Sequence, residues 1–295
     1  MFQRRPVSQP TPVPATATLE IPTPVVPTPL PDIPGISPEQ VRNSEYQLGF
    51  LDQVRMVQLT DGQYQDGEPG SVDYLSVNVT DFIARGDLNG DGENEAVAII
   101  AENYGGSGTF VFLAVYQYLN DEAAFLTSIF LDDRPIINHL GVEDGEIFVD
   151  AIVHERDDPM CCPTLAIIRS YFLNGVNLIL TSYSTETPSG APRAITIKAP
   201  VDDAQVSGII RLFGDVTIAP FENNLVYRVY DLGGVELSAG PVNVETPDLG
   251  APGTFEKAVD LGSIITNTTI RILVEDRNAA DGSLFAMDSV VLQVR

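Results

Sequence analysis

The chain is poor in basic residues, in cysteine and in long hydrophobic runs. Its 295 residues include 16 lysines and arginines against 41 aspartates and glutamates, a net charge of −25. A surface this acidic repels phosphate groups and attracts divalent cations, so we expect neither nucleic acid nor anionic lipid as a partner. No apolar run reaches about 18 residues, so we expect no transmembrane segment in this chain.

The shortage of basic side chains does not imply disorder, because hydrophobic residues make up 44 % of the chain. That fraction supports a core, and the length allows two domains. The N-terminus has no signal peptide, since Arg4-Arg5 is followed by Pro6 and by no apolar segment. Either the protein is cytosolic or the sequence begins after a leader. We expect the second, an extracytoplasmic protein that is part of the cell envelope or secreted.

Residues 1–36 contain ten of the 22 prolines. Such a tract favours extended polyproline II and predicts a semi-rigid stalk, of the kind that holds a lipoprotein-like domain away from a bacterial membrane or wall. The alternative is a disordered tail. Ser37-Pro38-Glu39-Gln40 then supplies an N-cap, a proline at the first helical position and a capping-box glutamine, so a short helix is predicted there.

An oxygen-rich loop runs from Asp87 to Glu95 and leads directly into the apolar run Ala96–Ile100. Side-chain oxygens fall at its positions 1, 3, 5 and 9, with glycine at position 6. Ca²⁺ takes about six to eight oxygen ligands, and alternate residues can point inward to supply them. We therefore predict a Ca²⁺ site whose ligands are Asp87, Asn89, Asp91, Glu95 and the carbonyl of Glu93.

This loop is not an EF-hand, because its twelfth position holds Ala98 in place of a glutamate and a buried strand is predicted after Glu95. It resembles the strand–loop–strand calcium sites of the FG-GAP and integrin-type repeats. Only one copy is present, so the resemblance implies a local calcium site and not a propeller. The alternative is an acidic turn that binds no metal.

Residues 37–184 are predicted to form a mostly-β domain, either α+β or all-β. Thr109–Tyr116 is a continuous apolar run suited to a central strand. Asp144-Gly145 and Asn174-Gly175 each separate two apolar segments and favour hairpin turns, since both dipeptides tolerate positive φ. Asp132-Asp133-Arg134 is interpreted as a solvated turn.

Residues 185–193 contain prolines and a glycine and are predicted to be a linker. Residues 194–295 follow, with seven short strands at the spacing of a β-sandwich. The expected strands are Ala194–Lys198, Ile209–Phe213, Leu225–Tyr230, Val235–Leu237, Phe255–Leu261, Thr269–Glu275 and Val290–Val294.

Five short motifs lie along this segment, and a family resemblance depends on them: Ala199-Pro200, Gly214-Asp215-Val216, Pro220–Val229, Gly253–Glu256 and Asp281-Gly282-Ser283. With these residues the segment resembles the immunoglobulin-like domain of bacterial spore-germination and cell-envelope proteins. The resemblance implies an extracytoplasmic, non-catalytic, immunoglobulin-like β-sandwich. We expect the core of this sandwich to contain Phe221, Leu225, Tyr227 and Phe255.

The only two cysteines are neighbours, Cys161-Cys162. Their Cα atoms lie about 3.8 Å apart, closer than the ordinary disulfide range of about 4.4–6.8 Å. We predict a vicinal disulfide between them. The alternatives are a pair of free thiols, or a metal or catalytic thiol acting with His154. Zinc needs four ligands, and the second histidine, His139, lies on an apolar segment.

The segment Asp157–Thr164 around the cysteines, together with the Asp-rich loop and the glycine-rich loop Gly105–Gly108, resembles uncharacterised bacterial envelope proteins. That resemblance implies a location and no activity.

No nucleophile–base constellation is recognisable, so we expect no catalytic residues and no enzyme. The predicted function is that of a calcium-stabilised envelope protein with a binding or structural role. Its partner would be an envelope protein or a polysaccharide. One alternative is a secreted hydrolase with a pocket between the domains, rimmed by His154 and the Asp157–Thr164 loop. The other is a thiol redox sensor that uses Cys161 and Cys162.

Overall fold

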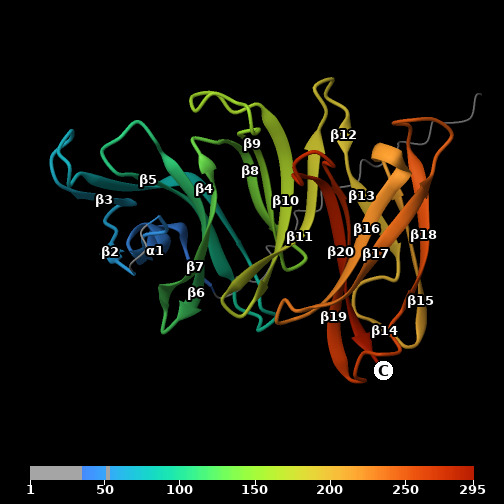
Figure 1. Cartoon of the computed structure of the whole chain (residues 1–295). Helices are drawn as coiled ribbons and strands as arrows, with labels where there is room; N and C mark the ends of the chain where they lie inside the picture. The colour runs from blue at the N-terminus through green and yellow to red at the C-terminus, as the bar shows by residue number, and fades with distance from the viewer. Residues whose placement is uncertain (1–34, 51–53) are drawn as a thin grey trace, which may run out of the picture. The chain divides into compact units, whose positions relative to one another are not determined.

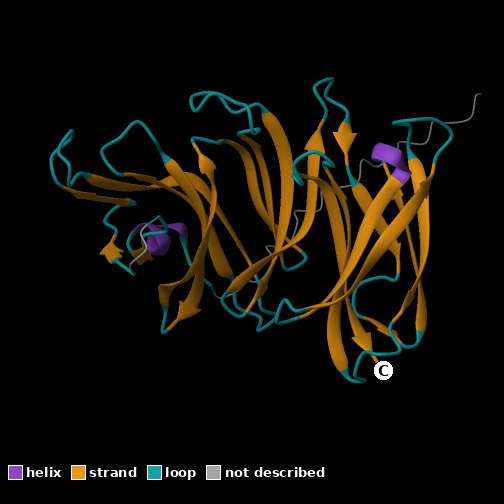
Figure 2. Ribbon diagram, in the orientation of Figure 1, coloured by secondary structure: helices purple, strands orange, loops and turns teal. Residues whose placement is uncertain are grey.

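The computed structural model describes residues 35–50 and 54–295 (Figure 1). The predicted proline-rich stalk, residues 1–36, lies outside these residues except for Gly35 and Ile36. The described chain is built mainly of antiparallel strands (Figure 2), which confirms the predicted mostly-β fold. In residues 35–50 and 54–295, no helix has the length and apolar character needed to cross a membrane.

The first described element is the helix α1 (Pro38–Arg42), where the sequence predicts it. Its capping box is complete, since Gln40 N donates to Ser37 Oγ (3.2 Å) and Ser37 N donates to Gln40 Oε1 (2.8 Å). Two short strands then pair with each other, and five more form a sheet in sequence order. These strands are β1 (Glu45–Gln47), β2 (Met56–Gln58), β3 (Gln63–Asp66), β4 (Leu75–Gly86), β5 (Glu95–Asn103), β6 (Phe110–Leu119) and β7 (Glu122–Asp133).

The centre of the five-stranded sheet is covered on both faces. In β5 the residues Glu95–Ile100 are all buried, and alternate side chains join two different hydrophobic clusters. This explains why Ala96–Ile100 is a continuous apolar run and not an alternating one. The pair Gly86↔Glu95 closes the β4–β5 ladder, so the Asp-rich loop is held at both ends by a buried sheet.

The remaining strands belong to a second, larger sheet that runs from β13 at one end to β8 at the other. They are β8 (Ile136–Glu143), β9 (Glu146–Val153), β10 (Leu165–Asn174), β11 (Asn177–Glu186), β12 (Pro192–Arg193), β13 (Ile195–Ala199), β14 (Ala204–Val206), β15 (Ile209–Val216), β16 (Asn224–Asp231), β17 (Glu236–Glu245), β18 (Gly253–Asp260), β19 (Thr268–Arg277) and β20 (Leu284–Val294). A 3-10 turn, η1 (Phe221–Asn223), precedes β16.

One of the two predicted hairpin turns lies one residue further along the chain. Asp144-Gly145 joins β8 to β9 with positive φ at both residues, 50° and 81°, as expected. In the β10–β11 hairpin, Asn174 still pairs with Asn177, so the turn is Gly175-Val176. Only Gly175 has positive φ there (62°). A type II′ turn needs positive φ at its first central residue alone, and glycine occupies that position.

Each of the seven strands expected after residue 194 is present, and most extend further than the apolar pattern indicates. Strands from both ends of this segment enclose one hydrophobic core, in a β-sandwich-like arrangement that includes Leu225, Tyr227 and Phe255. Phe221 was expected in that core but is 72 % exposed. It lies in the η1 turn, whose next residue Glu222 has φ 56°, and the alternation of a strand does not apply there.

Residues on both sides of the predicted linker share one sheet. Ser182 and Tyr183 of β11 pair with Asp288 and Met287 of β20 (Figure 1). The predicted linker, residues 185–193, contains the end of β11 and all of β12. The division into separate domains therefore stays a prediction.

Candidate functional site

The Asp-rich loop is organised by its first residue. Asp87 follows the last residue of β4, and its carboxylate accepts hydrogen bonds from Gly90 N (2.7 Å) and Gly92 N (3.0 Å). Both glycines have positive φ, 79° and 87°. These are the backbone conformations that glycine adopts without steric cost, so the spacing of glycines in the sequence serves the wrapping of the loop around Asp87.

Asn89 links the other predicted ligands. Its Nδ2 donates to Asp91 Oδ2 (2.9 Å) and to Glu95 Oε1 (3.1 Å), while its Oδ1 accepts from Asp91 N (2.8 Å). Asp91 Oδ1 in turn accepts from Glu93 N (2.8 Å). The structure thus connects Asn89, Asp91 and Glu95 directly. Glu93 takes part through its backbone N–H in this structure.

Glu95 is the most buried of these residues, at 2 % exposure. Apart from Asn89, the donor to its carboxylate is the backbone N–H of Leu88 (2.9 Å). Burial raises the pKa of the Glu95 carboxyl, and the neighbouring carboxylates of Asp91 and Asp87 add to the rise. The described donors to the carboxylates of Asp87, Asp91 and Glu95 are therefore all backbone or amide N–H groups, and none carries a full positive charge.

The side chains of the Asp-rich loop are of the type that binds a hard cation, but in this structure they are not arranged around one point. Three carboxylates and an amide oxygen are the donor set that Ca²⁺ prefers. In residues 35–50 and 54–295, however, no three His, Cys, Asp or Glu side chains are grouped as the ligands of one metal ion. The Asn89 amide group, with its N–H directed at two carboxylates, lies between the acidic groups instead.

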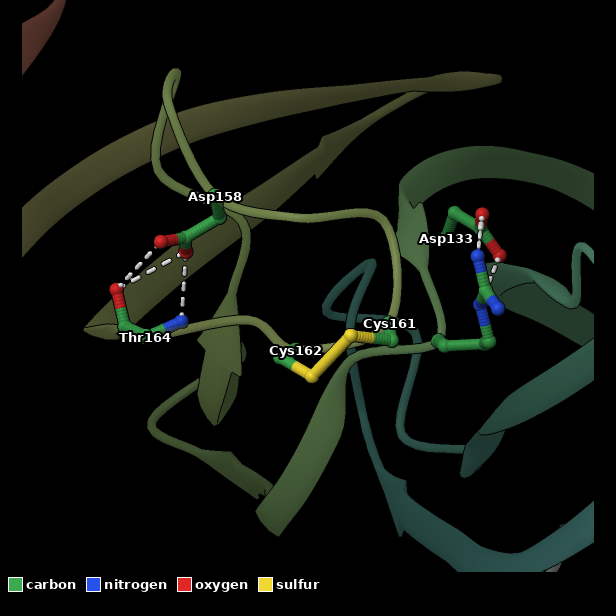
Figure 3. The surroundings of a disulfide bond; sticks show 6 residues. Asp133, Asp158, Cys161, Cys162 and Thr164 are labelled. Atoms are coloured by element: carbon green, nitrogen blue, oxygen red, sulfur yellow. Dashed lines mark hydrogen bonds and ion pairs between the residues drawn. A yellow bond between two sulfur atoms is a disulfide. The ribbon is translucent and has the colours of Figure 1, made fainter.

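The second candidate site is the cysteine loop between β9 and β10, where Cys161 and Cys162 form a disulfide (Figure 3). Both cysteines are exposed, as is Met160. The loop is closed by Asp158, whose carboxylate accepts from Glu155 N (2.9 Å) and from the backbone and hydroxyl of Thr164 (2.8 and 2.9 Å). These donors, Glu155 first, hold the pKa of Asp158 below its usual range.

His154 directly follows β9 and contacts Asp132 near the end of β7. The interpretation of Asp132-Asp133-Arg134 as a solvated turn is wrong, because Asp132 and Asp133 belong to β7 and are largely shielded from solvent. Asp132 Oδ2 accepts from His154 N (2.6 Å) and lies 2.9 Å from His154 Nδ1. This contact raises the pKa of His154. Asp133 is only 6 % exposed, accepts from Thr109 N and pairs with Arg134.

The Asp132–His154 pair resembles half of a catalytic arrangement in which a carboxylate orients an imidazole. His154 Nε2 is buried beside the Pro159–Met160 backbone and makes no hydrogen bond of good geometry. In the described part of the chain no hydroxyl or thiol hydrogen-bonds to this ring. A cavity of about 510 Å³ adjoins His154 and is also lined by Arg156, Tyr171 and Asp281.

The sequence pattern indicates the Asp-rich loop and the cysteine pair, but it does not indicate Asp132. Asp132 and His154 are 22 residues apart, and their contact arises from a β7–β9 approach that no local pattern signals. No protein-family model matches this chain, and none of the curated proteins compared with it matches either.

Proposed function

We propose that this chain is a non-catalytic, extracytoplasmic module of a bacterial cell envelope that is stabilised by Ca²⁺ bound in the Asp87–Glu95 loop. The observation that carries the proposal concerns the partners of the buried carboxylates. Five are buried in the described part of the chain, and four of them have an arginine or tyrosine partner: Glu102, Asp133, Glu275 and Asp276. The fifth, Glu95, has only amide and backbone N–H donors.

A buried carboxylate without a cationic partner is costly, and the cost grows when other carboxylates are near. A divalent cation bound by Asp87, Asp91 and Glu95 would remove that cost. Asn89 would exchange its N–H contacts for a contact through Oδ1, and the Glu93 carbonyl would add a ligand. The ion would neutralise the acidic groups and join the end of β4 to the start of β5.

The acidity of the chain supports this proposal, because a net charge of −25 concentrates divalent cations at the surface. The sandwich-like arrangement of the strands after residue 194 agrees with an immunoglobulin-like module. Such a module would act in binding or structural support, with an envelope protein or a polysaccharide as its partner.

Thermal unfolding with and without calcium tests the proposal. Calcium at ten times its Kd stabilises the folded state by about 1.4 kcal/mol, which corresponds to a Tm increase of roughly 2–4 °C in a chain of this size. We expect EDTA to lower the Tm of the wild type by that amount and to leave Asp91→Ala unchanged. The control is Asp73→Ala, an exposed aspartate outside the loop, which should respond like the wild type. A wild-type Tm that is the same in calcium and in EDTA would contradict the proposal.

A second candidate function is thiol–disulfide exchange, favoured by the exposure of the Cys161–Cys162 disulfide. A dithiol reductant would open it by transferring two electrons and two protons to the cysteines, and would itself become a disulfide. We expect mass spectrometry after alkylation to report two free thiols at a dithiol concentration that leaves ordinary buried disulfides closed. A pair that resists reduction in the folded protein would argue against this function.

A further inference from the structure

A cavity of about 390 Å³ lies where the β8–β9 hairpin faces the β11–β20 junction. Its lining is acidic and hydroxylic. A second cavity of about 740 Å³ shares Asp144, Glu146, Thr181, Asp202 and Ser289 with it, so the two form one continuous depression. The acidic residues of the smaller cavity are Glu143, Asp144, Glu146, Asp202 and Asp288.

These five carboxylates have no cationic partner. None forms an ion pair with another described residue, and no lysine, arginine or histidine lines either cavity. Backbone groups hold two of them in place. Asp288 accepts from Ile197 N (2.7 Å) and Ser289 N (2.9 Å), and Asp202 accepts from Val291 N (2.7 Å). Glu146 accepts no hydrogen bond of good geometry, although the Thr181 hydroxyl lies near enough to oppose the rise that burial causes in its pKa.

Burial and neighbouring carboxylates raise the pKa of two of these acids. Burial raises the pKa of Asp288 to about 6, and the carboxylates of Asp202 and Glu146 contribute to the rise. Burial likewise raises the pKa of Glu146, and Asp202 adds to it, while the nearby Thr181 hydroxyl opposes it. The depression therefore has a negative potential that the described residues leave uncompensated.

The geometry of Thr181 supplies a further indication of a ligand, beside the charges. Thr181 is 7 % exposed, it lines both cavities, and its Oγ1 has no hydrogen-bond partner of good geometry in residues 35–50 and 54–295. A buried hydroxyl without a partner costs about 1–3 kcal/mol. A donor bound beside Glu146 would satisfy both groups, because the hydroxyl oxygen can accept a hydrogen bond.

The size of the depression and its lining residues indicate which kind of cation it could bind. The combined space is much larger than one metal ion requires, and no three acidic side chains of the described residues are grouped around a single point. Apolar side chains lie among the acids, namely Phe148, Phe172, Leu173 and Val291. An elongated molecule with ammonium groups separated by methylene chains matches this alternation of charged and apolar surface.

We propose that this depression binds an aliphatic polyamine, with Glu146 and Asp202 pairing with its ammonium groups and Thr181 Oγ1 accepting a hydrogen bond from one of them. The larger cavity is also lined by Asp87 and Asn89, so the depression adjoins the calcium loop, but the proposed polyamine contacts are made by other residues, Glu146, Asp202 and Thr181.

Isothermal titration calorimetry of the full chain with spermidine at pH 7.5 tests the proposal. We expect saturable binding with one molecule per chain. Glu146→Gln should weaken the affinity about tenfold, since one ammonium–carboxylate contact is lost. Thr181→Val keeps the shape of the side chain and removes the hydroxyl, and should weaken the affinity about threefold or more. Asp73→Asn removes an exposed charge elsewhere and should leave the affinity unchanged.

Two results would overturn the proposal. One is binding that is not saturable, or that weakens equally in Glu146→Gln and Asp73→Asn, because this would mean general attraction to an acidic surface. The other is heat on titration with CaCl₂ that is lost in Glu146→Gln, together with no heat from spermidine, because the depression would then be a metal site. Asp91→Ala separates this test from the calcium loop, since it should retain spermidine binding whatever the outcome for calcium.

Discussion

At the scale of single residues, the buried and half-buried acids of this chain differ in which donors and charges surround them. Glu102 is fully buried, yet it accepts from the hydroxyls of Tyr46 (2.7 Å) and Tyr104 (2.6 Å) and from Gly49 N (2.8 Å). Asp288 has only backbone donors, and the carboxylates that face it are Asp202 and Glu146, with Glu143 and Asp144 on the same cavity wall. Asp288 is therefore a residue through which pH should act on stability.

The sign of that effect follows from the pKa of Asp288, about 6 in the folded protein against an ordinary 3.8. Between these values the folded chain holds a proton that the unfolded chain has released, so the free energy of unfolding decreases as pH rises through 6. We expect a decrease of about 1–2 kcal/mol from this group between pH 5 and pH 7.5. Urea unfolding should show a smaller decrease in Asp288→Asn, whose amide does not titrate. Equal decreases in variant and wild type would contradict this assignment.

A site can be predicted from the sequence when its residues are close together along the chain, and not when the fold brings distant residues together. The proposed loop ligands Asp87 to Glu95 are neighbours in sequence, so the prediction of them rests on alternation and glycine spacing alone. The acidic depression joins Glu146, Thr181, Asp202 and Asp288, which no spacing connects. In a chain this acidic, a further aspartate carries no signal until the fold brings it beside another.

At the scale of elements, β16 (Asn224–Asp231) and β19 (Thr268–Arg277) are joined by more than their ladder. Glu275 is 2 % exposed and lies between Arg228 Nε (2.7 Å) and Arg277 Nη2 (2.8 Å). Arg228 also pairs with Glu236 of β17 (2.6 Å). The network links three neighbouring strands, and removing its buried member takes a partner from both arginines, of which Arg228 keeps Glu236.

We predict that Glu275→Ala lowers the free energy of unfolding by about 1.5–3 kcal/mol, because it removes hydrogen bonds to charged groups while the two arginines stay partly exposed to water. The matched control is Glu256→Ala, which breaks the exposed pair with Arg211 across β15 and β18 (2.6 Å). That loss should be about 1 kcal/mol or less. Chemical denaturation compares the two variants, and losses of similar size would show that the Glu275 network does not support the sheet.

Strands were the most predictable elements, because the alternation of apolar side chains is set by the strand itself. The seven strands after residue 194 follow it, and so does the buried run in β5. Two positions in turns escaped prediction. Phe221 was assigned to the core from its neighbours, but it lies in a turn with positive φ and faces solvent. The Gly175-Val176 turn differs from the predicted one because only one residue there needs positive φ.

At the scale of the whole described chain, the larger sheet passes through the β11–β20 pairing, and Leu273 and Met287 join the same hydrophobic cluster as Tyr183. This pairing connects residues more than 100 positions apart, so no local pattern indicates it. It creates the wall on which Asp288 and Thr181 meet. The net charge of −25 is thus distributed unevenly, with acids gathered in one depression and in one loop.

The central claim, that the Asp87–Glu95 loop binds calcium, is tested most directly by isothermal titration calorimetry with CaCl₂ on the decalcified full chain. We expect one saturable site per chain in the wild type and in Asp73→Ala, and no such site in Asp91→Ala, whose side chain no longer offers an oxygen to the ion. The absence of a saturable calcium site in the wild type, or an unchanged site in Asp91→Ala, would contradict the claim.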